Sequence, residues 1–143
     1  MAIKQITVFV ENKQGALVSI TDTLAENNVN IRALSIAETE DFGILRLIVN
    51  DEETAKKTLT ENGYLIKVTN VVGVKIGDAP GKLTEALRVL DNAGINMEYL
   101  YAFMARTEKH AYVVIRVENN DAAENALRDT GFKIVTEADV NKL

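Results

Sequence analysis

The stretch that decides the fold is DAPGKLTEALRVLDNAGINM, residues 78–97, because the stretch NKQGALVSITDTLAENNVNI, residues 12–31, has the same pattern 66 positions earlier. A turn glycine, two helix-spaced leucines and an asparagine are identical in the two stretches: Gly15, Leu17, Leu24 and Asn30 match Gly81, Leu83, Leu90 and Asn96. The offset then becomes 68, and further identities follow: Val49, Ala55, Leu59, Gly63 and Ile66 match Val117, Ala123, Leu127, Gly131 and Ile134. One unit was therefore duplicated and gained two residues near its middle, since so long a period suits two small domains rather than a solenoid.

The composition is that of an ordinary globular protein, with 143 residues of which 47% are hydrophobic and 26% charged. Each copy alone would be marginally stable, so we expect the two to share an interface. The absence of cysteine excludes disulfides, thiol catalysis and thiolate metal sites. A net charge of −5 without a dense basic stripe argues against nucleic acid and membrane partners. With no charged-then-apolar leader and no long apolar run, we expect a cytoplasmic protein.

Each copy predicts the same order of elements. Alternating apolar residues predict strands around 6–10 and 72–76, and an apolar stripe predicts a helix after each strand, ending at Asn28 and Gly94. The later elements are two strands, a helix and a last strand, at 31–37, 44–49, 52–62 and from 64 in the first copy, and at 97–105, 112–117, 121–130 and from 132 in the second. The two inserted residues fall in the hairpin around 107–110. The order βαββαβ predicts two ferredoxin-like α+β domains, 1–69 and 70–143, each an antiparallel sheet with both helices on one face.

Two motifs in each copy resemble those of the ACT domain, a ligand-sensing βαββαβ module. In the second copy they are Asp78-Ala79-Pro80-Gly81-Lys82-Leu83 and Gly94-Ile95-Asn96-Met97, and in the first Asn12-Lys13-Gln14-Gly15-Ala16-Leu17 and Asn28-Val29-Asn30-Ile31. The resemblance covers nearly the whole chain as a tandem pair. It implies two domains side by side in a continuous eight-stranded antiparallel sheet with helices on one face, a free amino acid bound at their interface, and neither catalysis nor a cofactor.

The residues themselves allow such a site. Gly15 and Gly81 stand where a strand hands over to a helix, and a residue without a Cβ lets a ligand approach the N–H groups of the first helical turn. An α-carboxylate suits that position, because a helix N-terminus presents donors and partial positive charge. Asn side chains, Asp78 or strand carbonyls could accept from the α-ammonium group.

The family resemblance implies that two residues from opposite domains hold each ligand. Asn12 and Asn96 would form one site, and Asp78 and Asn30 the other. The first pair keeps both amides, whereas the second has an acid, and Gln14 replaces the usual proline. The predicted ligand-binding residues are Asn12, Lys13, Gln14, Gly15, Ala16, Leu17, Asn30, Ile31, Asp78, Ala79, Pro80, Gly81, Lys82, Leu83, Asn96 and Met97.

Plainer interpretations stay open for these residues. The glycines could serve only the turn, and the asparagines could bond only to nearby backbone. His110, the sole histidine, is expected on the solvated surface. The acidic run that begins at Asp51 is expected to cap a helix.

An aromatic patch distinguishes the second copy. Tyr99, Tyr101 and Phe103 alternate along one predicted strand and face away from the helices, with Tyr112 and Val114 beside them. A large exposed apolar patch marks an interface, so we expect a homodimer contact there. Alternatively, the C-terminal residues 137–143 cover the patch, or a tyrosine reaches the ligand.

Three classes of function follow. The leading hypothesis is a non-catalytic amino-acid sensor, with a metabolic enzyme as a possible partner. The alternatives are a regulatory or structural subunit without a ligand of its own, and a small acylphosphatase-like hydrolase, whose phosphate cradle would have only Lys13 and Lys82 as candidate cations. A metal site is not expected, because one histidine and no cysteine leave carboxylates without a recognisable loop spacing.

Overall fold

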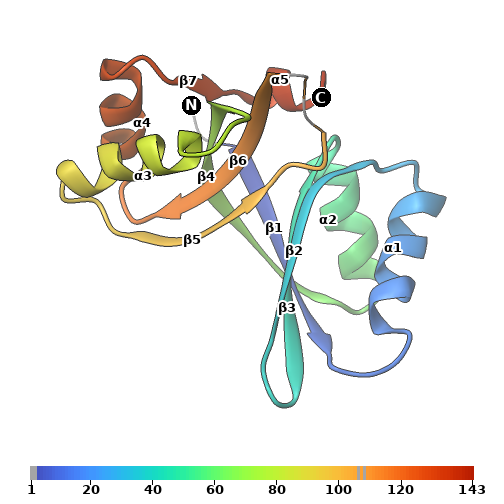
Figure 1. The fold of residues 1–143 in the computed structure, drawn as a ribbon. Coiled ribbons are helices and arrows are strands. Elements are labelled where there is room, and N and C mark those ends of the chain that lie inside the picture. The colour runs from blue at the N-terminus through green and yellow to red at the C-terminus, as the bar shows by residue number, and fades with distance from the viewer. Residues whose placement is uncertain (1–2, 106, 108) are drawn as a thin grey trace. The chain divides into compact units, whose positions relative to one another are not determined.

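The computed structural model describes residues 3–105, 107 and 109–143 (Figure 1). Within them lie seven strands and five helices: β1 Ile3–Glu11, α1 Ala16–Glu26, β2 Ile31–Glu38, β3 Phe42–Val49, α2 Glu52–Glu61, β4 Leu65–Gly77, α3 Lys82–Asn92, β5 Met97–Ala102, β6 His110–Val117, α4 Asn120–Asp129, β7 Lys133–Val135 and α5 Glu137–Val140. The chain divides into two compact units. We call Lys4–Thr69 the first unit, and Asn70–Leu143 together with Ile3 the second unit.

The first unit is a ferredoxin-like α+β domain with strand order β2-β3-β1-β4. β3 pairs antiparallel with both β1 and β2, and α1 and α2 lie together on one side of these strands (Figure 1). Even-numbered residues of β1 face the helices, as alternation requires. They form one core with buried residues of the other elements: Ile6, Val8, Val10, Ile20, Leu24, Leu45, Leu47, Ala55 and Leu59.

The second unit repeats this arrangement with strand order β5-β6-β4-β7. β6 pairs antiparallel with β4 and β5, β7 pairs antiparallel with β4, and α3 packs against α4. Its core uses the matching positions of the repeat: Val72, Val74, Ile76, Ala86, Leu90, Val113, Ile115, Val117, Ala123, Leu127 and Ile134. The two units therefore have the same core built from the same pattern.

One strand replaces two that the sequence analysis expected. β4 runs without a break through the last strand of the first copy and the first strand of the second, so seven strands, not eight, lie within the described residues. The physical reason is that residues 65–72 contain neither proline nor glycine and are rich in β-branched side chains, which favour an extended chain. The continuous eight-stranded sheet is therefore not confirmed.

α1 and α3 end two residues earlier than predicted, at Glu26 and Asn92, but the predicted conformation of the residues after them is confirmed. Asn28 and Gly94, which follow α1 and α3, have φ of +59° and +72°. This is the left-handed conformation expected directly after a helix. Asp51 caps α2, as predicted, by accepting a hydrogen bond from the Thr54 N–H at 3.1 Å.

The aromatic patch is not an exposed surface. Tyr101 and Phe103 are only 8% and 6% exposed, and Tyr99 and Tyr112 are half-buried. Tyr101 and Phe103 are thus covered within the chain, and alternation alone predicts the face of a strand but not what covers that face. The homodimer stays a prediction. The hairpin predicted around 107–110 includes position 108, which lies outside the described residues.

Candidate ligand-binding site

The turns before α1 and α3 have the same geometry. Gly15 has φ +85° and ψ −9°, and Gly81 has φ +85° and ψ −10°. In each turn the first helical N–H donates to a carbonyl three residues back, Ala16 to Lys13 at 3.3 Å and Lys82 to Ala79 at 3.2 Å. A Cβ on either glycine would meet no atom within 4 Å. Both glycines therefore open onto free space at the start of a helix.

These two helices differ from the others in how they begin. Asp51, Asn119 and Thr136 cap α2, α4 and α5 through side-chain hydrogen bonds to backbone N–H groups. The N-cap residues of α1 and α3 are Gly15 and Gly81, which have no side chain that could accept such a bond. The first N–H groups of a helix have no partner within the helix and carry partial positive charge, so an uncapped end favours an anionic group.

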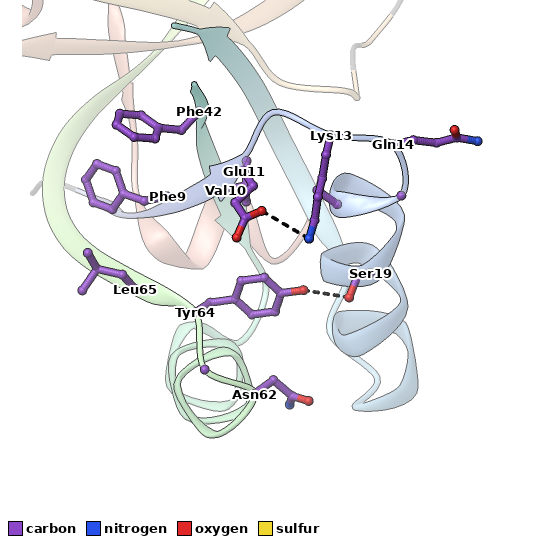
Figure 2. A pocket seen from close by; sticks show the side chains of 13 residues that line it. Phe9, Val10, Glu11, Lys13, Gln14, Ser19, Phe42, Asn62, Tyr64 and Leu65 are labelled. Carbon is purple, nitrogen blue, oxygen red and sulfur yellow. Dashed lines mark hydrogen bonds and ion pairs between the residues drawn. The ribbon is translucent and has the colours of Figure 1, made fainter. Parts of the chain in front are cut away.

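A cavity of about 740 Å³ lies beside the first of these turns (Figure 2). It lies entirely within the first unit, between the end of β1, the start of α1, the start of β3 and the loop that joins α2 to β4. The lining residues are Phe9, Val10, Glu11, Lys13, Gln14, Gly15, Ala16, Ser19, Phe42, Asn62, Gly63, Tyr64 and Leu65. Its size is within the usual range for small-molecule sites.

Four of the polar side chains that line the cavity form two pairs. Lys13 Nζ lies 3.2 Å from Glu11 Oε2, and Ser19 Oγ lies 2.7 Å from the Tyr64 hydroxyl oxygen (Figure 2). Both members of the ion pair are exposed, so the pair contributes little to stability and can rearrange around a ligand. The two hydroxyl groups can each donate or accept.

Apolar side chains form the other side of the cavity. Phe9, Phe42 and Leu65 are 39%, 53% and 70% exposed. In Figure 2 they lie in a row on one side of the view, and Lys13 and Ser19 lie on the opposite side. The cavity therefore has a polar end near the start of α1 and an apolar end across the strand ends.

The predicted binding residues are found in several places. Four of them, Lys13, Gln14, Gly15 and Ala16, line the cavity; Asn12 directly precedes them, and Leu17 follows in α1. In the second copy, 78–81 form the turn before α3, and Lys82 and Leu83 begin that helix.

The asparagines that follow the helices have separate surroundings. The N–H of Asn30, next to Ile31, donates to Asn50 Oδ1 at 2.8 Å. Asn96 and Met97 line a second cavity of about 420 Å³ at the end of α3. The predicted pairs Asn12 with Asn96 and Asp78 with Asn30 join residues of different units and stay predictions.

The other nine lining residues were not predicted as site residues: Phe9, Val10, Glu11, Ser19, Phe42, Asn62, Gly63, Tyr64 and Leu65. They come from four elements and loops, and the register that pairs Glu11 with Phe42 brings the ends of β1 and β3 together. Such proximity is not visible in a local motif. The sequence did contain one signal for these residues, namely a difference between the two copies. In the aligned repeat, Phe9 corresponds to Lys75 and Leu65 corresponds to Lys133.

Two classes of site receive no support from the described residues. They bring together no group of three His, Cys, Asp or Glu side chains that could hold a metal ion. Within the same part of the chain, every helix is too short or too polar to span a lipid bilayer.

Known proteins identify the family. The ACT domain pair family matches residues 1–143. Protein BT0572 from Bacteroides thetaiotaomicron has a similar structure, with a TM-score of 0.93 and 39% identity over 100% of this chain and 98% of that chain. The regulatory subunit of aspartate kinase from Thermus thermophilus, in its ligand-free form, shares the fold with a TM-score of 0.65 and 17% identity over 92% of this chain and 94% of that chain.

The corresponding subunit from Thermus flavus is similar in fold, with a TM-score of 0.59 and 17% identity over 90% of this chain and 92% of that chain. The curated proteins include no match. Since the family match spans the whole chain and the fold is the expected pair of βαββαβ units, this chain belongs to the ACT domain pair family.

Proposed function

We propose that this protein is a non-catalytic regulatory protein that binds a free amino acid. The observation that carries the proposal is the uncapped N-terminus of α1, where Gly15 opens onto a cavity of suitable size. The ligand's carboxylate accepts from the N–H groups of the first turn, which also present partial positive charge. Glu11, the Ser19 and Tyr64 hydroxyl groups, and the Asn12 amide are nearby acceptors for its ammonium group.

The proposal includes residues of the second unit. As the family resemblance implies, Asn12 and Asn96 hold one ligand, and Asp78 and Asn30 form a second, less similar site. The match to an ACT domain pair supports this arrangement. Single substitutions of these four residues test whether each contributes to ligand binding, and the test does not depend on the distance between the paired residues.

The surroundings of Lys13 and Lys82 argue against the acylphosphatase-like hydrolase, for which these lysines are the candidate phosphate-binding residues. A phosphate cradle needs positive charge that is free to meet the substrate. Lys13 Nζ lies 3.2 Å from a Glu11 carboxylate oxygen, and Lys82 Nζ lies 3.4 Å from Glu85 Oε1. Both pairs are exposed, and each carboxylate lowers the positive charge that a phosphate group would meet there, so we propose that the protein has no acylphosphatase activity.

Regulation requires that the amino acid bind two states of the protein with different affinity. We propose that the loop before α1 becomes ordered around the ligand and that a metabolic enzyme responds to this change. Two proteins of the same fold are regulatory subunits of aspartate kinase, which supports an enzyme as partner. A second copy of the chain is the other proposed partner, and the molar mass in solution, measured with and without amino acid, checks it.

Thermal denaturation with each of the twenty amino acids at millimolar concentration tests the proposal. A ligand at 100 times its Kd raises the free energy of unfolding by about 2.7 kcal/mol, so the melting temperature should rise clearly for some amino acids and not for others. The amide of a stabilising amino acid, which lacks the carboxylate, should stabilise much less.

The substitutions Asn12→Ala and Asn96→Ala should reduce the ligand-induced shift. If no amino acid moves the melting temperature and both variants behave like the parent protein, the proposal is wrong. A subunit without a ligand of its own would then be the better description.

A further inference from the structure

The two units carry different side chains at matching places around this cavity. Phe9 and Lys75 each stand two residues before the last residue of β1 and β4, Phe42 and His110 are the first residues of β3 and β6, and Leu65 and Lys133 are the first residues of β4 and β7. We call Phe9, Phe42 and Leu65 the apolar row. The second unit forms the same fold with two lysines and a histidine at these places, so the fold itself does not require apolar residues there.

The side chains of the apolar row are also more exposed to water than is usual for large apolar residues. Its three members are between 39% and 70% exposed, although the same backbone positions accept side chains that water solvates well. Neighbouring exposed apolar side chains usually mark a surface that binds something. The row borders the cavity at the start of α1, so what it contacts also lies against that cavity (Figure 2).

A second difference concerns the space beside the turn. In the second unit the Lys82 stem lies over Gly77, since a Cβ on Gly77 would be only 2.9 Å from Lys82 Cγ and 3.1 Å from Cδ. The ammonium end of Lys82 lies 3.4 Å from Glu85 Oε1. The first unit has Ala16 in place of this lysine and Glu11 in place of Gly77, and the Glu11 carboxylate lies 3.2 Å from Lys13 Nζ. The first turn therefore has an exposed ion pair and a cavity beside it, whereas its counterpart has the packed stem of Lys82.

From these differences we infer that the cavity of the first unit selects an amino acid with a large apolar side chain, aromatic or branched, and that the matching place in the second unit does not. This inference rests on the proposed function. The ligand's charged groups meet the polar end at the start of α1, and its side chain lies along the apolar row.

The expected selectivity follows from buried apolar area. Burying a large apolar side chain against such a row makes phenylalanine or leucine bind roughly 10- to 100-fold more tightly than alanine. Serine and aspartate bind more weakly still, because their polar groups would lose water without gaining partners along the row.

An apolar segment of a protein is the competing occupant of the row. The hollow shape and the polar groups at one end favour a small zwitterion, since a flat protein contact would use neither. The experiment below treats a protein contact as a separate outcome.

Titration calorimetry on the full chain tests the inference with phenylalanine, leucine, alanine, serine and aspartate. Two variants introduce the residue of the second unit, Leu65→Lys and Phe42→His, and Lys133→Ala is the control at the position matching Leu65. Because these side chains are exposed, we expect the melting temperature of the free protein to change little.

Phenylalanine or leucine should bind most tightly, both variants should weaken that binding at least tenfold, and Lys133→Ala should leave it unchanged. Tighter binding of serine or aspartate than of phenylalanine would overturn the selectivity and leave the proposed function standing. If none of these five amino acids binds and none of the twenty raises the melting temperature, both proposals fail. If, in addition, Leu65→Lys abolishes self-association in sedimentation, the row is a protein contact.

Discussion

Comparing Gly15→Ala with Gly81→Ala separates two effects of the turn glycine: its contribution to the free energy of unfolding, and its proposed contribution to ligand binding. The two glycines have the same φ of +85° and ψ values one degree apart, and a Cβ on either meets no atom within 4 Å. Steric overlap with the surroundings is therefore absent from both substitutions. What remains is the strain of a left-handed L-residue, about 1–2 kcal/mol.

Both variants should therefore lose the same free energy of unfolding, about 1–2 kcal/mol, in urea denaturation followed by circular dichroism. Asparagine at either position should lose less than alanine, because it tolerates the left-handed conformation better. The equality is the sharper part of the prediction, since it depends on the matching dihedral angles and not on the absolute cost.

The response to ligand should differ. The new methyl group of Gly15→Ala enters the open space of the cavity, so it should reduce the stabilisation by an apolar amino acid. Gly81→Ala should keep that stabilisation. The reasoning is refuted if the two variants differ by more than about 1 kcal/mol without ligand, or if neither variant loses stability.

Two further predictions concern the cores and the helix caps. Leu59→Ala and Leu127→Ala remove fully buried side chains at matching places of α2 and α4, and each should cost about 2–5 kcal/mol in urea denaturation; a loss below 1 kcal/mol in only one of them would contradict the equivalence of the cores. Hydrogen bonds from the Thr54 hydroxyl and then the Thr54 N–H lower the pKa of Asp51 below its ordinary value of 3.8. This contribution to stability is thus present above the ordinary pKa and is lost as pH falls through the lowered one, so Asp51→Asn should flatten the acid dependence of unfolding; an unchanged acid limb would count against it.

Much of this fold can be predicted from the sequence because helices and their ends depend on residues that are close together in the chain. The spacing of apolar residues predicted α1 and α3, and Asn28 and Gly94 have the left-handed conformation that ends such helices. The continuity of β4 was missed for the opposite reason. Where no turn residue interrupts an extended run, the pattern contains no mark at which one strand ends and the next begins.

The site could be predicted only in part. Lys13, Gln14, Gly15 and Ala16 are adjacent in sequence, so a turn motif predicts them together. The apolar row comes from three strand ends that meet only in the folded sheet, and its members look like ordinary strand residues in isolation. The burial of Tyr101 and Phe103 likewise depends on tertiary packing, which no strand pattern contains.

A duplicated chain offers an internal comparison that a single domain lacks. The two units have matching cores, matching strand orders and turn angles within one degree, so residues that serve the fold should be replaceable with equal effect in both. Residues that serve a ligand need not follow that symmetry, and the two units differ in this way at Leu65 and Lys133 and at Ala16 and Lys82. Equal losses of stability combined with unequal losses of binding would therefore distinguish fold from function at each pair of positions, because the same backbone supports both side chains.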